Sequence, residues 1–476
     1  MTVISIALYW SIAIWGLVSH RPVLLYLFFA SFSFGSVAVV PPAALGGLTI
    51  IPTSMTLVLI IFKTLTNESV ILTAISSAID PRRLGFLFAF WIAAGITTIF
   101  MPGLFAGHVM IVPIRGDVST IAPLAPTKQN FSQFVYLTIS VVAVFVFAQL
   151  FKCQQNRQVA LQGILFGSIV TVATGALDYA SQYIPIKPFL DIFRTATYSL
   201  LVDVEVQGAK RVVGLMPEAS SFGNLSINML CFLYFLRRGI RSPRIRDIYA
   251  PVVVILLVFC VWLSTSSAAY VGLALFFVVA GFEWLVRFLE TRYSRLRRRH
   301  LGAEFSAVVL AVVSLASILL FKPSLLDGII QIIDRMVFQK TQSDSFEERN
   351  MWTLVSLRAL TDTYGIGVGV GATRTSNHIV AVLSSTGVLG ALFYTIFIFQ
   401  SLLRQAAPGD QEGAALASAL RYAFVPPFIV RLLIGTSPDF GEGGAFTFGL
   451  LTAVGLGGLY SYTRRNRYVH SSTTAA

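Results

Sequence analysis

The sequence predicts an all-α polytopic membrane protein. Of its 476 residues, 55% are hydrophobic and only 12% are charged, whereas soluble domains carry about 25% charged residues. Nearly uncharged stretches recur from end to end, and a helix of about 18 such residues or more crosses the roughly 30 Å hydrocarbon core of a bilayer. The short alternating segments of a membrane β-barrel are not recognisable in the sequence.

About thirteen membrane-spanning helices are expected from these stretches. Their approximate cores are 3–18, 22–40, 46–62, 84–101, 131–151, 159–177, 218–236, 248–263, 268–286, 303–321, 377–399, 415–435 and 444–462. The first is predicted to be a retained helix, because no basic residue precedes it and no small-residue cleavage site follows it. The chain is expected to form a single integral membrane domain (1–476) with three long loops at 102–130, 178–217 and 322–376.

Basic residues divide unequally between the two sets of connections. One set holds 22 of the 35 lysines and arginines with 8 acidic residues, while the rest of the chain holds 13 basic and 14 acidic residues. Excess lysine and arginine mark the cytoplasmic side, so the N-terminus is predicted outside and the C-terminus inside. The net charge of +13 is therefore interpreted as a topology signal aided by anionic membrane lipid, and no nucleic acid partner is predicted.

No metal site or cofactor is predicted. Cys153, Cys231 and Cys260 lie in or beside apolar spans at no metal-like spacing, and they indicate neither a zinc site nor a disulfide framework. The alternate glycines of the segment 364–371 form neither a dinucleotide fingerprint nor a Walker loop. They are expected to permit tight turns or close backbone approach.

The second long loop ends in a group of charged residues at the start of a span. Pro217 suits the first turn of a helix, and Glu218 in that turn is favoured by the helix dipole. Lys210 and Arg211 precede them and Ser220 follows. The group predicts an anion-binding mouth, although a helix start with a neutral charge pair fits the same residues.

The third long loop contains an expected helix over 346–361. A Ser-x-x-Glu capping box at 345–348 precedes it. Arg349 and Ser356 are seven residues apart and share a helix face, with Trp352 between them. A guanidinium fixed in this way can hold a phosphate through two hydrogen bonds. A surface helix with ordinary ion pairs is the alternative interpretation.

Two further groups are candidates for function. His378 stands beside Arg374 at an outer helix end, and histidine has the intrinsic pKa of a base near neutrality, although a lone histidine more often packs. Arg431 lies inside a span, where an ionisable residue is costly and is usually functional or paired. Asp439 and Glu442 in the next outer turn are its expected partners.

Over roughly residues 130–400, the ordered motifs resemble the bacterial O-antigen polymerase and O-antigen ligase superfamily, which includes exopolysaccharide polymerases of the Wzy and ExoQ type. The motifs are Arg211-x-x-Gly-x-x-x-Glu-Ala-Ser220, the Ser/Thr-rich hairpin 264–267, Glu348-Arg349 before Trp352, Gly-x-Gly-x-Gly, and His378 before Gly387-Val-Leu-Gly390. Two features depart from the pattern. The hairpin has Ser-Thr-Ser-Ser where relatives often have Ser-Arg-Ser, and the usual His-Asn order is reversed.

The resemblance implies a GT-C-like bundle with long periplasmic loops in a bacterial inner membrane. It implies a metal-independent, inverting glycosyltransferase that polymerises polyprenyl-diphosphate-linked oligosaccharide repeats into O-antigen or exopolysaccharide. Arg211 and Arg349 match the two functional arginines, His378 the outer histidine, and Glu218 the acidic residue of the polymerase-like branch. His378 is the first candidate base and Glu218 the second, while Lys210 and Arg374 are expected to assist the arginines. A chain-length regulator and a flippase are the implied partners.

Two other functions remain open. An O-antigen ligase would transfer the same lipid-linked glycan to a lipid A core or another acceptor, and Glu218 favours the polymerase over it. A lipid-linked glycan transporter is the second alternative, although transporters typically show inverted repeats and no repeat is recognisable in the sequence. A purely structural membrane subunit would leave the charged outer loops unexplained.

Overall fold

The structure is a computed structural model that is almost entirely helical. It describes residues 2–41, 49–114, 120–198, 200–203, 205–206, 209–289, 301–321 and 344–456. Within these ranges, eight helices are long and apolar enough to cross a membrane, or nine if the bent pair α3 and α4 counts as one span. The four strands in these ranges are two residues long each, and they form two antiparallel pairs. The expectation of an all-α, multi-pass membrane protein is confirmed at this level.

The elements follow the chain in this order. The α-helices are α1 Thr2–Val18, α2 Val23–Ser31, α3 Pro52–Leu65, α4 Glu68–Ile79, α5 Gly85–Leu104, α6 Lys128–Leu150, α7 Gln154–Ala180, α8 Lys187–Asp191, α9 Ala219–Leu236, α10 Ala250–Leu263, α11 Ser267–Leu289, α12 Leu301–Phe321, α14 Asp344–Asp362, α15 His378–Leu403 and α16 Gln411–Ile434. Residues 441–456 are also helical. The strands are β1 Met110–Ile111, β2 Ala122–Pro123, β3 Glu205–Val206 and β4 Ala209–Lys210.

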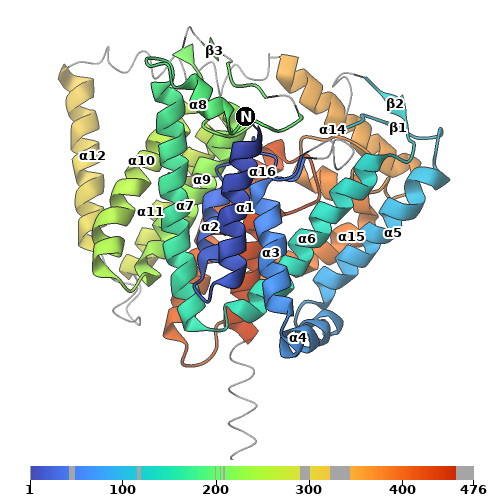
Figure 1. Ribbon diagram of the computed structural model, residues 1–476, viewed down its shortest axis with the longest axis horizontal. Coiled ribbons are helices and arrows are strands. Elements are labelled where there is room, and N and C mark those ends of the chain that lie inside the picture. The colour runs from blue at the N-terminus through green and yellow to red at the C-terminus, as the bar shows by residue number, and fades with distance from the viewer. Residues whose placement is uncertain are drawn as a thin grey trace, which may run out of the picture.

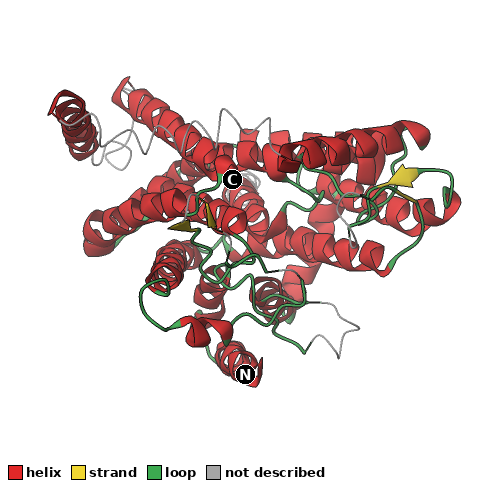
Figure 2. Ribbon diagram, turned by 90° about the horizontal axis from the view of Figure 1, so that it is seen from above, coloured by secondary structure: helices red, strands yellow, loops and turns green. Residues whose placement is uncertain are grey.

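The three long connections gather at one end of the helices. Figure 1 shows α8, β3, the β1–β2 pair and α14 at the same end, whereas α4 lies at the opposite end, bent by 108° from α3. Seen from above, the loops cross the middle of an elongated group of helices (Figure 2). The part of the third long loop at 322–343 lies outside the described residues.

One expected span, 22–40, is wrong as a continuous helix. Helix α2 ends at Ser31, and residues 32–41 continue as irregular but mostly buried chain. Their backbone groups bond to other segments, with Ser36 N donating to Leu215 O and Val39 N to Ile50 O, both at 2.9 Å. Irregular backbone is tolerated at membrane depth where protein supplies its partners. This segment therefore supports the loop that carries Glu218.

Helices α2 and α7 pack closely because α7 presents two small residues to α2. Gly163 and Gly167 form a Gly-x-x-x-Gly pair, a spacing that lets helix backbones approach in membranes. A Cβ on Gly167 would stand 2.5 Å from the carbonyl oxygen of Phe29. Phe29 in turn packs edge-on against Phe446, with the ring centroids 5.1 Å apart. The contact fixes α2, and with it the irregular segment behind the Glu218 loop.

Substituting Gly167 with alanine should destabilise the protein, because the added methyl group collides with backbone that cannot move cheaply. Overpacking of this kind costs about 1–3 kcal/mol. Thermal unfolding of the purified protein in detergent measures the effect. Gly281→Ala is the matched control, since a Cβ on Gly281 meets nothing within 4 Å, and there alanine is expected to be neutral or slightly stabilising. Equal melting temperatures of the two variants would contradict the tight α2–α7 contact.

Candidate functional site

A polar cavity of about 480 Å³ lies at the end of the helices that carries the long loops. Its wall comes from the start of α9, from α14, from the start of α15, from the end of α16 and from the two loops beside them. Seven of the nine residues predicted for the site line it: Glu218, Ser220, Arg349, Trp352, Arg374, His378 and Arg431. The fold thus brings together side chains from four distant parts of the chain.

One wall of the cavity is cationic. Arg349 and Trp352 project from the same face of α14, and the guanidinium of Arg374 lies 5.0 Å from the centroid of the Trp352 ring. Arg374 also donates to the carbonyl oxygen of Ile114. Burial lowers the pKa of Arg374, while the charge of Glu348 opposes that change, and a guanidinium stays charged at neutral pH. Among the described residues, no hydrogen-bond or ion-pair partner is found for the guanidinium of Arg349.

Helix α14 lies where the sequence predicted a helix. Its observed range, Asp344–Asp362, contains the expected 346–361. Ser356 is fully buried on its inner face, where it lies 3.1 Å from Thr373 Oγ1 and donates to Arg374 O at 3.0 Å. The shared face of Arg349, Trp352 and Ser356 is confirmed. The side chain of Ser345, on which the predicted capping box depends, lies outside the described residues.

The glycine-rich segment after α14 forms a chain of tight turns. Gly365, Gly367, Gly369 and Gly371 all have positive φ, between 79° and 92°. A Cβ would stand 2.9 Å from Thr97 O at Gly369, and 2.6 Å from Gln129 O at Gly371. Both reasons expected for glycine here are confirmed: a left-handed backbone and a close approach. The turns press this segment against α5 and α6 and carry Arg374 to the cavity.

Glu218, at the N-terminus of α9, also lines the cavity. The helix begins at Ala219, so Glu218 is its N-cap residue and Pro217 precedes the cap. The prediction that both residues lie within the first turn is therefore wrong. The reason is local: Glu218 is extended (φ −154°, ψ 163°), and Pro217 O accepts a hydrogen bond from Leu201 N at 2.8 Å. The Glu218 carboxylate accepts a hydrogen bond from Ser220 and a longer one, 3.4 Å, from Ser221.

Arg211 and Lys210 are not on the cavity wall. Arg211 binds the hairpin between α10 and α11, with Nε donating to Thr265 Oγ1 and Nη2 to Thr265 O, both at 2.9 Å. Thr265 has a φ of 45°, which a β-branched residue rarely adopts. Burial lowers the pKa of Arg211, and the charge of Glu218 opposes this shift. Lys210 pairs with Asp178 at 3.4 Å and with Asp203 at 3.7 Å.

Asp178 organises this loop, and the sequence analysis missed it. Its side chain is completely buried near the end of α7. Oδ2 accepts from Val213 N at 2.7 Å and Gly214 N at 3.1 Å, while Oδ1 pairs with Arg194 at 3.1 Å. The signal was available, because an acidic residue at the end of an apolar span is costly unless it is paired or functional.

His378 uses both ring nitrogens inside the protein. The residue is 1% exposed; Nδ1 lies 3.0 Å from Ser437 O, and Nε2 lies 2.9 Å from the Tyr394 hydroxyl. Because a carbonyl oxygen only accepts, Nδ1 carries the proton and Nε2 accepts from Tyr394. The ring joins the start of α15 to the loop after α16 and shapes the cavity there.

Arg431 stands between two pockets. It lines the polar cavity, and together with Asn224 it also lines an aromatic pocket towards the interior of the bundle, with Phe232, Phe428, Phe440 and Phe448 among its walls. Arg431 Nη1 reaches the backbone oxygen of Asp439 at 3.5 Å. No ion pair with the carboxylates of Asp439 or Glu442 is found among the described residues, and Glu442 accepts from Ser54 at 2.5 Å. The expected carboxylate pairing is therefore wrong in this structure.

The cavity thus combines three arginines, two carboxylates and several hydroxyl groups at the loop-bearing end of a multi-pass helical protein. Among the described residues, no group of three or more histidine, cysteine, aspartate or glutamate side chains could hold a metal ion. No protein-family model matches the chain, and no curated protein matches it either. The functional argument therefore rests on the cavity itself.

Proposed function

We propose that the protein is a glycosyltransferase that polymerises polyprenyl-diphosphate-linked oligosaccharides at the periplasmic face of a bacterial inner membrane. One observation carries the proposal: Arg349, Arg374 and Arg431, from three separate segments, line one cavity with Glu218 on another wall. The adjoining aromatic pocket has a volume of about 50 Å³, which is room for only a few carbon atoms of a lipid-linked donor. In this topology the N-terminus is periplasmic, the C-terminus is cytoplasmic, and the bundle is of the GT-C-like class.

The arginines would stabilise the leaving group. In the reaction, an acceptor sugar hydroxyl attacks the anomeric carbon of the donor, and the bond from that carbon to the diphosphate oxygen breaks. The diphosphate departs with the bonding electrons and remains attached to the polyprenyl chain. Cations fixed where this negative charge develops lower the barrier because they need no reorganisation during the reaction. Arg349 is the best placed, since none of the described residues neutralises it.

The acceptor hydroxyl must lose its proton to a base within hydrogen-bond reach. The geometry favours Glu218, whose carboxylate lines the cavity and is held by Ser220 and Ser221. His378 is the weaker candidate, because its Nε2 lone pair is engaged by Tyr394. In this proposal His378 is a positioning residue that holds the loop at Ser437. Arg211 acts in the same way by holding the hairpin next to Glu218.

Purified protein reconstituted with a lipid-linked oligosaccharide repeat tests the proposal. Formation of long chains by the protein alone supports a polymerase and excludes a pure transporter. Transfer of a finished glycan to a lipid A core without chain growth would assign the protein as a ligase. Movement of the lipid-linked glycan between leaflets without any new glycosidic bond would overturn both enzyme assignments.

Glu218→Gln should reduce turnover by about two orders of magnitude or more, because an amide cannot take the acceptor proton. Retention of the lipid-linked donor should change little, since the three arginines remain. The measurement compares initial rates of chain growth with the amount of donor bound. Glu347→Gln is the matched control, with the same change on an exposed residue of α14 outside the cavity. A Glu218→Gln variant with normal turnover would remove Glu218 as the base.

A further inference from the structure

A second cavity lies at the opposite ends of the same helices. Its volume is about 390 Å³, and it is lined by the last turn of α9, by the segment 237–246, by α11 and by the beginning of α16. Glu218 therefore caps one end of α9 and Arg238 follows its other end. Helix α16 carries Arg431 near one end and Glu412 near the other. The glycosyltransferase proposal assigns no role to this second cavity.

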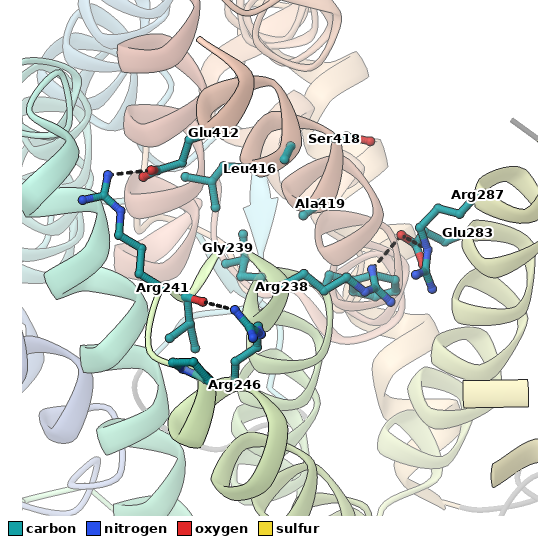
Figure 3. A pocket seen from close by; sticks show the side chains of 15 residues that line it. Arg238, Gly239, Arg241, Arg246, Glu283, Arg287, Glu412, Leu416, Ser418 and Ala419 are labelled. Carbon is teal, nitrogen blue, oxygen red and sulfur yellow. Dashed lines mark hydrogen bonds and ion pairs between the residues drawn. The ribbon is translucent and has the colours of Figure 1, made fainter. Parts of the chain in front are cut away.

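Four arginines and two carboxylates line the second cavity (Figure 3). The exposed Arg241 pairs with Glu412 at 2.8 Å. Buried Arg238 pairs with Glu283 at 2.7 Å and with Glu304, which does not line the cavity, at 2.9 Å. Arg287 pairs with Glu283 at 2.9 Å. Arg246 donates to the carbonyl oxygen of Ile240 and to the neighbouring Asp247. Together with Asp247, Glu304 and Arg237, which pair with these side chains or with each other, the whole network has five cations and four carboxylates. Its net charge is therefore slightly positive, which favours an anion over a cation.

The ion pairs leave buried polar atoms unused. Arg238 is 8% exposed, yet no described group accepts a hydrogen bond from its Nε, and no described group donates to Oε2 of the 5% exposed Glu283. A network that served only to hold helices together would satisfy nearly all such atoms. One ligand that both accepts and donates hydrogen bonds would complete it: a phosphate for Arg238 and a hydroxyl group for Glu283.

The remaining wall is apolar, and ring contacts connect it to an exposed phenylalanine. Phe235 and Leu416 line the cavity. The Phe235 ring stacks on Tyr422 with centroids 6.1 Å apart, and Tyr422 lies 6.4 Å from the ring of Phe282, which is 58% exposed. The volume also has room for about a dozen water molecules at roughly 30 Å³ each, so a phosphate ion alone would leave most of it unfilled. These features favour an amphiphile over a free anion.

We propose that this cavity binds the headgroup of an anionic phospholipid of the phosphatidylglycerol type from the adjoining leaflet. The phosphate lies among Arg238, Arg241 and Arg246, a headgroup hydroxyl donates to Glu283, and the acyl chains follow the aromatic residues outward. Basic pockets between membrane helices on the cytoplasmic side bind anionic headgroups in this way. The neighbouring π-helical turn, Ile245–Tyr249, fits the site, because such turns occur frequently at functional positions.

The test measures lipid binding to the full-length protein. Purified protein is delipidated and titrated with phosphatidylglycerol, phosphatidylcholine or inorganic phosphate, and bound lipid is counted by native mass spectrometry together with the melting temperature. Phosphatidylglycerol is expected to bind the protein and raise its melting temperature. Phosphatidylcholine and inorganic phosphate are expected to do neither. Equal binding of the two lipids would overturn the proposal, and so would equal stabilisation by inorganic phosphate.

Arg241→Gln tests the site itself, because this exposed residue can be replaced without leaving Glu412 alone, which keeps a contact of 3.2 Å with Gln158. The affinity for phosphatidylglycerol should fall about ten-fold, which corresponds to about 1.4 kcal/mol. Arg244→Gln is the matched control, since Arg244 is exposed in the same segment but does not line the cavity. If the two substitutions lowered the affinity for phosphatidylglycerol equally, the lipid would be bound by general surface charge and not by this cavity. Neither readout depends on glycan transfer, so the outcome is separable from the glycosyltransferase proposal.

Discussion

Replacing Arg349 with alanine is expected to abolish long-chain polysaccharide while the protein remains folded in the membrane. The guanidinium is half-buried on the cavity wall, and none of the described residues pairs with it. Its removal therefore leaves no partner charge uncompensated, and a change of stability within about 0.5 kcal/mol is expected. A fixed cation at the developing diphosphate charge should matter far more for rate, with a loss of about two to three orders of magnitude.

The measurement is the chain-length distribution on gels, together with the initial rate of the proposed reaction with the reconstituted protein and the protein level in the membrane. Arg358→Ala is the matched control, because Arg358 is exposed on the same helix and does not line the cavity. Arg349→Lys should restore only part of the rate, since an ammonium group cannot form the paired bonds of a guanidinium. A normal chain length in the Arg349→Ala variant would contradict the proposal that Arg349 binds the diphosphate.

Local patterns in the sequence predicted much of this site. Hydropathy predicted the eight long apolar helices found among the described residues. The spacing of Arg349, Trp352 and Ser356 predicted that they share one face of α14, where Arg349 and Trp352 line the cavity and Ser356 bonds to Arg374 O. The glycine turns were predictable for the same reason. Glycine at 369 and 371 indicates a backbone with positive φ, and this can be inferred without knowing which residues pack against it. In each case the physical cause lies within a few residues of the feature.

What the sequence did not predict depends on partners far away in the chain. The hydropathy of 22–40 is that of a span, but its later half is bonded to residues such as Leu215 and is not helical. Arg211 was expected at the diphosphate and instead binds Thr265, 54 residues away. Arg431 was expected to pair with a carboxylate and instead reaches a backbone oxygen. Periodicity gives no information about which of several distant acceptors a guanidinium finds.

Asp178→Asn is expected to have the largest effect on stability. All the recorded partners of this buried carboxylate are donors, namely the backbone N–H groups of Val213 and Gly214 and the side chains of Arg194 and Lys210. The side-chain amide of asparagine has an NH₂ group in place of one carboxylate oxygen. In either orientation of the amide, this NH₂ group would face an N–H donor of the protein and could not form a hydrogen bond with it. It also leaves two cations without their buried counter-charge, and breaking a buried pair in this way costs about 3–5 kcal/mol.

Thermal unfolding and chain growth should both be measured on this variant, because the loop that Asp178 holds continues directly into Glu218. Asp191→Asn makes the same chemical change next to the same Arg194, but Asp191 is 47% exposed at 3.2 Å from that guanidinium. Surface pairs contribute at most about 1 kcal/mol, so this control should unfold near the wild-type temperature and keep its activity. If the two variants proved equally stable, Asp178 would not be the anchor of the loop, and the position of Glu218 would have to be maintained by the hairpin contact of Arg211 instead.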